Sequence, residues 1–343
     1  MSKAQPRFEL SQSIVVAKYN ELAEIVDSVY YSSKTNPLVT PILEQQTNSF
    51  FSVHTNAELK HIKDKSRVLF FGVAWSQSDI ESLYELGVRE FAVDSHTDLD
   101  TFLNVIGERD ATLFLRMKLK ENSVRSEKYY VFGLGKQFVS DSVKKIHLEK
   151  PHIKLGVHVH RKTQNLNEWD LQTDVAHALD EEAFNCLSYL NFGGGLPSLY
   201  SNTNEKVIPS ILNKISSFRV WLNERGIKLI AEPGRFIAAP AVRLISHVTC
   251  VEAQTLFLDI SVYNANTDAI FGGQRLLVEG EQKQGDYYML KGKTPDSIDI
   301  LRYRVYMNQK VTVGDEVVFL NAGAYNFHCD FCELERIETV VVK

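Results

Sequence analysis

The sequence predicts an α/β protein with a (β/α)8 TIM-type barrel and a C-terminal β-rich domain. Short runs rich in β-branched and aromatic residues alternate with stretches whose apolar residues recur at helical spacing, and this alternation stops after Pro240. We therefore expect the barrel over residues 11–240 and the β-rich domain over residues 241–343, with residues 1–10 joining the second domain.

Eight apolar runs are the predicted barrel strands. They lie at residues 29–33, 49–53, 67–72, 89–94, 111–117, 154–160, 187–192 and 227–232. Between them, helical spacing is clearest from Ile208 to Leu222, a predicted long helix that ends at Gly226. Eight strand–helix units in succession are typical of a (β/α)8 barrel.

The C-terminal part reads as short strands separated by turns. The predicted strands lie at residues 255–258, 275–279, 287–290 and 316–320, and turn pairs such as Gly272-Gly273 and Gly314-Asp315 lie between them. Arg7–Leu10 also reads as a strand, which places the N-terminal residues in this domain.

Composition excludes several classes of function. The formal net charge of −5 over 343 residues does not favour binding to nucleic acid or to an anionic membrane surface. No apolar run reaches the length of a membrane-spanning helix, and the first residues lack the apolar core of a signal peptide. Four cysteines favour a reduced, cytoplasmic protein. Cys329 and Cys332 form a C-x-x-C without a second pair, so no metal is expected.

Polar and glycine residues follow the predicted strands, where barrels of this kind carry their chemistry. The eight strands end at, or run into, Lys34, His54, Gly72, Asp94, Arg116, His160, the triplet Gly193-Gly194-Gly195, and Glu232. Each residue alone has an ordinary structural explanation. Converging at one rim, they predict a single polar site above an apolar barrel.

Two of these strand ends suit a phosphate group. Gly193, Gly194 and Gly195 allow backbone amides to approach an anion closely. The segment Glu232-Pro233-Gly234-Arg235 follows the eighth strand, and loops after the seventh and eighth strands are the usual phosphate site of barrels. Arg235 can donate two hydrogen bonds to the same anion.

A phosphate site, a lysine and a carboxylate together indicate pyridoxal 5′-phosphate (PLP). Lys34 would form a Schiff base with the aldehyde, which requires a lowered lysine pKa, and Arg116 and burial would both lower it. Glu232 would pair with the pyridine nitrogen and keep the ring an electron sink. His160 would stack on the ring.

At these residues the sequence resembles the fold-type III PLP-dependent decarboxylases of ornithine, diaminopimelate and arginine, which share an alanine-racemase-like barrel. Five segments carry the resemblance, in the family's order: YSSKTNP at 31–37, VHVH at 157–160, NFGGGLP at 191–197, AEPGR at 231–235 and GAY at 323–325. The resemblance implies the Schiff-base role of Lys34, an arginine beside the cofactor at Arg116, and a phosphate contact from Tyr325.

The resemblance also implies a head-to-tail homodimer with shared active sites. The loop that completes the partner's site would be residues 292–299, in which Asp296 would contact the substrate. The family carries a proton-donating cysteine before that aspartate, whereas this chain has Pro295. His160, Lys34 or a water remain as proton donors.

A second departure follows His160, where the family usually has Gly-Ser and this chain reads Arg161-Lys162-Thr163. Thr163 would replace the serine hydroxyl at the phosphate. Arg161 and Lys162 either indicate a substrate with an extra anionic group or face outward, and we favour the outward orientation.

Residues 263–273 match the family's specificity segment. The arginine that binds a distal carboxylate in diaminopimelate-type members falls at Thr267 or Asp268, so it is missing here. Asp268 and Phe271 are the candidate substrate contacts, and Asp268 favours a distal amine. The expected activity is therefore decarboxylation of a small basic amino acid, such as ornithine or lysine, to an amine of polyamine metabolism and CO2.

Other functions remain open at this point. A diaminopimelate- or carboxyamine-type decarboxylase fits the same motifs. A racemase would need a second base on the opposite face, and no clear tyrosine supplies it. A non-catalytic binding homologue is favoured slightly by the missing cysteine. His158 and His160 share a strand face and would suit a metal hydrolase, but that hypothesis leaves Lys34 unexplained.

Overall fold

The computed structural model describes residues 5–119, 132–326 and 328–343. The chain forms two compact units. The barrel unit comprises Lys18–Pro197 and Lys206–Gly234, and the sheet unit comprises Met1–Ala17, Ser198–Glu205 and Arg235–Lys343. The division predicted at residue 240 stays a prediction. Within the described residues, no helix is long and apolar enough to cross a membrane.

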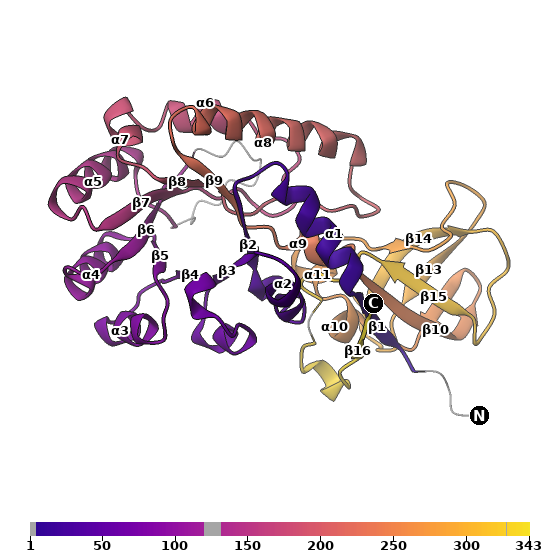
Figure 1. The fold of residues 1–343 in the computed structure, drawn as a ribbon. Helices are drawn as coiled ribbons and strands as arrows, with labels where there is room; N and C mark the ends of the chain where they lie inside the picture. Colours follow the sequence, from indigo (N-terminus) through magenta and orange to yellow (C-terminus); the bar gives the residue numbers. More distant parts are fainter. Residues whose placement is uncertain (1–4, 120–131, 327) are drawn as a thin grey trace. The chain divides into compact units, whose positions relative to one another are not determined.

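The barrel unit contains a closed ring of eight parallel strands (Figure 1). The strands are β2 (Ser28–Ser32), β3 (Phe50–Val53), β4 (Val68–Phe71), β5 (Glu90–Val93), β6 (Ala111–Arg116), β7 (Ile153–His158), β8 (Tyr189–Asn191) and β9 (Lys228–Ala231). All eight predicted strands are present, with bounds that differ by one or two residues. The predicted fold class is confirmed.

Helices connect the barrel strands, and α3, α4 and α5 lie outside the ring (Figure 1). The helices are α1 (Gln12–Ala23), which leads in from the sheet unit, α2 (Thr40–Gln46), α3 (Gln77–Glu85), α4 (His96–Ile106), α5 (Lys136–Glu149), α6 (Leu171–Ala176), α7 (Glu181–Asn185) and α8 (Ile208–Asn223). Ser76 and Asp79 cap α3 reciprocally, and Ser95 caps α4, which satisfies backbone amides that a helix start leaves unbonded.

Apolar side chains from several strands, most of them large, fill the barrel core. They are Tyr30, Leu69, Phe71, Ala92, Phe114 and Ile230, with Phe50 and Tyr189 packed against them. Phe114 pairs with Gly156 across β6 and β7, and a Cβ built on Gly156 would lie 2.5 Å from the Phe114 ring. Glycine at this position therefore makes room for an aromatic ring inside the barrel, which is a packed core rather than a pore.

The sheet unit is built around β10, which pairs with three strands. Its strands are β1 (Arg7–Ser11), β10 (Val242–Glu252), β11 (Thr255–Leu258), β12 (Leu277–Val278), β13 (Asp286–Lys291), β14 (Ile300–Met307), β15 (Glu316–Leu320) and β16 (Glu338–Val342). The order is β12-β15-β10-β11-β13-β14, and β1 joins β10 antiparallel and β16 in parallel. Three short helices complete the unit: α9 (Arg235–Ala238), α10 (Val262–Ala265) and α11 (Asp268–Phe271).

Candidate active site

Lys34 lies directly after β2, in a short 3-10 turn over Ser33–Thr35. Ser33 and Thr35 are buried, while the Lys34 side chain reaches solvent. The Ser33 hydroxyl lies 3.0 Å from that of Thr40, and the Ser32 amide donates to the carbonyl of Pro233 at 3.0 Å. These contacts fix the backbone on both sides of the lysine, so its amine is held at the carboxyl end of the barrel.

The surroundings of Lys34 lower the pKa of its amine. Desolvation by the surrounding protein is the largest cause, and the positive charge of Arg116 adds to it, while Glu232 and Glu58 act in the opposite direction. The direction is the one expected from the sequence. A lowered pKa raises the fraction of neutral amine, which is the nucleophilic form.

A row of rings crosses the same end of the barrel. His54 is parallel to Phe71 with ring centroids 5.8 Å apart, Phe71 meets His158 edge-on at 4.6 Å, and His158 is parallel to His160 at 6.1 Å. Burial lowers the pKa of His158, and burial together with His158 and Arg116 lowers that of His160 to about 3. Both imidazoles are therefore neutral near pH 7.

Glu232 directly follows β9, and its side chain is 5% exposed. Asn191 donates a 2.8 Å hydrogen bond from its amide nitrogen to Oε1, and His158 Nε2 lies 3.5 Å from Oε2. Burial raises the pKa of this carboxyl, but His158, His54 and Asn191 outweigh burial and hold the pKa at about 2. The site thus contains a buried, ionised carboxylate.

The glycine triplet after β8 lies against the neighbouring strand ends. Gly193 and Gly195 have positive φ angles of 68° and 89°. A Cβ on Gly193 would lie 2.6 Å from His160 Nδ1, and one on Gly194 would lie 2.9 Å from the carbonyl oxygen of Glu232. The Gly194 amide donates to His160 Nδ1 at 3.3 Å. Both conformation and space therefore require glycine, and the loop lies against His160 and against the carbonyl of Glu232, which begins the second segment predicted to bind phosphate.

Two further predicted residues lie in the barrel unit. Arg116 ends β6, where Nη1 is 3.7 Å from Asp94 Oδ2 and the guanidinium lies over the Phe71 ring. Thr163 is exposed. Arg161 is 2% exposed and forms an ion pair with Asp174, so the outward orientation expected for it is wrong.

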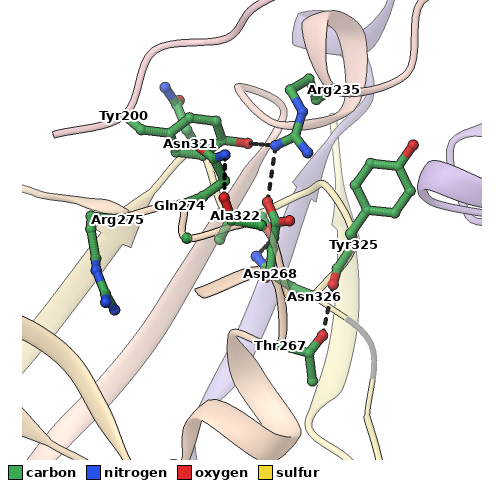
Figure 2. A network of polar contacts seen from close by, with 12 residues as sticks. Tyr200, Arg235, Thr267, Asp268, Gln274, Arg275, Asn321, Ala322, Tyr325 and Asn326 are labelled. Atoms are coloured by element: carbon green, nitrogen blue, oxygen red, sulfur yellow. Dashed lines mark hydrogen bonds and ion pairs between the residues drawn. The ribbon is translucent and has the colours of Figure 1, made fainter. Parts of the chain in front are cut away.

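The sheet unit holds a second group, which we call the Arg235 cluster: the predicted residues Arg235, Asp268 and Tyr325 together with Tyr200 (Figure 2). Arg235 Nη1 donates to the Tyr200 hydroxyl and to Asp268 Oδ2, both at 2.9 Å. The guanidinium carbon lies 5.2 Å from the centre of the Tyr325 ring. Burial raises the pKa of Tyr200 to about 12, so its hydroxyl stays neutral.

The two predicted substrate contacts of α11 differ in exposure. Asp268 is buried and its carboxylate is engaged with Arg235, whereas Phe271 is 86% exposed. Tyr325 has a φ of 57°, and its carbonyl accepts a 2.7 Å hydrogen bond from the Thr267 hydroxyl (Figure 2). The substrate roles of Asp268 and Phe271 stay predictions.

The loop expected to reach a partner subunit has a fixed backbone. Asp299 is fully buried and accepts hydrogen bonds from the amides of Val262 and Thr294 and from the Thr294 hydroxyl. Asp296 accepts a 2.8 Å hydrogen bond from the Tyr263 hydroxyl. Pro295 is exposed. Its replacement of a cysteine leaves this loop without a proton donor at that position.

Sequence reasoning missed several residues that shape these two groups. Asn191, Glu58 and Tyr200 received no role, and His158 and His54 were considered only as metal ligands or as strand ends. Asn191 and His54 each follow or end a barrel strand, which is a signal that strand ends carry chemistry. Over the residues that the structure describes, no group of three or more His, Cys, Asp or Glu side chains has the arrangement of a metal site.

The pyridoxal-dependent decarboxylase model, for the pyridoxal-binding domain, matches residues 13–239. The chain belongs to this family. The match confirms the predicted family and the predicted PLP cofactor. Among curated relatives, the diaminopimelate decarboxylase of Neisseria meningitidis serogroup B is 23% identical over 270 residues, which cover 72% of this chain and 64% of that enzyme, slightly less than two thirds of its length.

Solved structures show the same fold at low sequence identity. The lysine/ornithine decarboxylase of Vibrio vulnificus, complexed with putrescine, has a TM-score of 0.78 and 22% identity, and the match covers 98% of this chain and 94% of that one. The arginine decarboxylase of Paramecium bursaria Chlorella virus has a TM-score of 0.80 and 19% identity, with 99% and 96% covered.

Proposed function

We propose that this protein is a PLP-dependent carboxy-lyase that decarboxylates a small amino acid, with Lys34 as the residue that binds the cofactor covalently. The observation that carries the proposal is a solvent-accessible amine with a lowered pKa, held at the end of β2 in the same barrel unit as a buried, ionised Glu232. A purely structural lysine would not need either property.

The residues of the barrel unit fit PLP. The glycine triplet leaves no room for a Cβ and turns through positive φ angles, as a loop that approaches a phosphate closely must. Neutral His160 offers a flat ring, and Glu232 offers a negative charge for a protonated pyridine nitrogen. When bound, PLP supplies an electron sink for the electron pair left behind as CO2 departs.

Each residue then has a defined task. Lys34 presents its neutral amine to the aldehyde, and Arg116 helps to keep that amine unprotonated. Glu232 keeps its negative charge because His158, His54 and Asn191 together outweigh the effect of burial on its pKa. The glycine loop, Thr163, Gly234, Arg235 and Tyr325 are the proposed phosphate contacts, as predicted from the sequence.

For the substrate, we favour a small basic amino acid such as ornithine or lysine, with Asp268, Phe271 and Asp296 as contacts. Structural neighbours with bound putrescine, cadaverine and agmatine support this choice. The second candidate is diaminopimelate, because the curated relatives are named diaminopimelate decarboxylases and because Asp268 is engaged with Arg235. We also propose that the protein is a cytoplasmic homodimer that acts in polyamine synthesis.

The test is a CO2-release assay of the PLP-loaded protein with ornithine, lysine, arginine, diaminopimelate and carboxylated polyamines. We expect CO2 from one of them and a loss of about 10³-fold or more in kcat for Lys34→Ala, with loss of the lysine-bound visible absorbance. Lys60→Ala, which removes an exposed lysine of the same unit, is the control and should behave as wild type. PLP chemistry without CO2 from any substrate would refute the decarboxylase assignment.

A further inference from the structure

His54 is an ionisable side chain directly beside the amine of Lys34. It follows β3 directly, and its Nε2 lies 3.2 Å from Lys34 Nζ, within hydrogen-bonding distance. The side chain is 27% exposed, so it can exchange protons with solvent. Its ring stacks on Phe71, which limits its rotation.

Glu58 lies on the other side of the His54 imidazole. The 3-10 turn Asn56–His61 brings the Glu58 carboxylate back, so that Oε1 accepts hydrogen bonds from the His54 amide and the Thr55 hydroxyl, both at 3.1 Å. Glu58 Oε2 lies 4.0 Å from His54 Nδ1. Both of these atoms are buried and have no hydrogen-bond partner among the described residues. A small movement of either side chain would bring the two atoms into hydrogen-bonding distance.

The charge state of Glu58 favours this arrangement. Burial raises the pKa of the Glu58 carboxyl, but its interactions with His54 and Thr55 outweigh burial and lower it, so Glu58 is ionised near pH 7. A carboxylate beside Nδ1 stabilises the imidazolium and fixes which nitrogen faces Lys34.

Together the three side chains have the order nucleophile, base and orienting carboxylate that activates nucleophiles in many unrelated enzymes. Building on the proposed function, we propose that His54 is the general acid–base residue of this site: it exchanges a proton with Lys34 Nζ and supplies the proton that replaces the departing carboxylate. Glu58 is its positioning residue.

The proton balance needs such a group. The neutral amine of Lys34 forms when the ammonium gives one proton to His54 Nε2. Decarboxylation consumes one proton, because a hydrogen takes the place of CO2 on carbon. The His54 imidazolium gives that proton, returns to the neutral form and is recharged from water. Pro295 has no proton to give, and His158 and His160 are held in the neutral form by burial.

The main experiment compares wild type with His54→Gln, which keeps a hydrogen-bonding side chain but cannot carry a proton. We expect PLP affinity to stay within about threefold, the rate of covalent PLP loading on Lys34 to fall about tenfold or more, and kcat to fall about 10²- to 10⁴-fold. Added imidazole should restore part of both rates in His54→Ala. His152→Gln is the control, because His152 precedes β7 at the opposite end of that strand.

The rate of covalent PLP loading and kcat together distinguish the possible results. Unchanged loading and a kcat within about threefold of wild type would overturn the proposal. Slow loading with a normal kcat would overturn the role as proton donor. If wild type releases no CO2 from any substrate, the decarboxylase assignment fails, while the loading rate still tests the exchange between His54 and Lys34.

Glu58→Gln separates positioning from a merely structural role. The groups that face His54 are Lys34, Glu58, His158 and Glu232, with Phe71 under the ring. If Glu58 acts through His54, Glu58→Gln should lower the loading rate and kcat by a similar factor and leave KM within about threefold of wild type. Adding Glu58→Gln to His54→Gln should then cause little further loss of either rate. A full additional loss in the double variant would contradict the role of Glu58.

Discussion

The Arg235 cluster of the sheet unit and the rim of the barrel around Lys34 handle buried polar groups in opposite ways. In the Arg235 cluster, a buried guanidinium is matched by the Asp268 carboxylate and the Tyr200 hydroxyl at 2.9 Å each. At the rim of the barrel, buried atoms of His54, Glu58, Asp94 and His158 have no hydrogen-bond partner among the described residues, although charges of both signs lie close by.

This difference distinguishes polar groups that stabilise the fold from polar groups that can take part in a reaction. A fully matched ion pair has one low-energy geometry, and it resists protonation and movement. Groups with unfilled hydrogen-bonding capacity can change partners and protonation state as a reaction proceeds, which is where shifted pKa values gather in enzymes. The comparison predicts that substitutions in the Arg235 cluster reduce stability in addition to any effect on cofactor or substrate binding, whereas substitutions around Lys34 mainly reduce rate.

The largest effect on stability is expected from Asp268→Ala. The substitution removes the negative charge that offsets the buried Arg235, and breaking a buried ion pair from one side costs about 3–5 kcal/mol. The free energy of unfolding from urea titration measures it. Glu279→Ala is the matched control, because it breaks an exposed pair with Arg243 in the same unit and should cost about 0–1 kcal/mol. Equal losses in the two variants would break the comparison.

Glu90, the first residue of β5, extends the comparison to a carboxyl of the barrel unit that lies away from the rim around Lys34. Burial raises the pKa of this carboxyl to about 7, against the hydrogen bond from Tyr30 and the charge of Lys154, and Oε2 has no hydrogen-bond partner in the described part of the chain. The folded pKa lies above the unfolded value, so the folded state binds the proton more tightly. The contribution of Glu90 to stability should therefore be greatest below about pH 4.5 and be lost as the pH rises through about 7.

Glu90→Gln mimics the protonated carboxyl and should remove this loss. We expect the variant to be about 2–3 kcal/mol more stable than wild type near pH 8, with little gain near pH 4. Urea unfolding at the two pH values measures the difference. Glu85→Gln on the exposed side of α3 should give no pH-dependent gain. A gain for Glu90→Gln that is the same at both pH values would show that the carboxyl does not titrate with folding.

The smallest effect is expected from Tyr200→Phe. The change removes one hydrogen bond to Arg235 and keeps the ion pair with Asp268, so it should cost about 1–2 kcal/mol of unfolding free energy. Thermal unfolding beside Tyr303→Phe, which alters an exposed tyrosine of the same unit, measures it. A loss for Tyr200→Phe as large as that for Asp268→Ala would mean that the hydroxyl, rather than the carboxylate, stabilises the guanidinium.

The sequence predicted the barrel because its strands are buried on both faces and read as short apolar runs. β4 is an example: all four residues from Val68 to Phe71 are buried. Strand bounds were less certain, since hydrogen bonding rather than composition decides where a strand ends. The predicted strand that ran to His160 stops at His158, before the chain turns toward the glycine loop.

Ion pairs between residues that are far apart in the chain cannot be predicted from a single sequence. Asp268 lies 33 residues from Arg235, and no spacing indicates that they meet. Arg161 was expected to face outward because arginines usually do, but Asp174 provides a counter-charge that allows its burial. Lys34 and Glu232 were found because each stands at a strand end beside a distinctive motif, whereas His54 and Glu58 have no such motif around them.

The hydrogen bonds of Asp299 have a consequence for assembly. Asp299 accepts hydrogen bonds from the amide of Thr294 within the 292–299 loop and from the amide of Val262 in α10, and a Cβ on Gly292 would lie 2.2 Å from its carboxylate. The loop therefore has its shape within a single subunit. Association through this loop would therefore lose little conformational entropy. An induced ordering of the loop on contact is not needed, and rigid docking suffices.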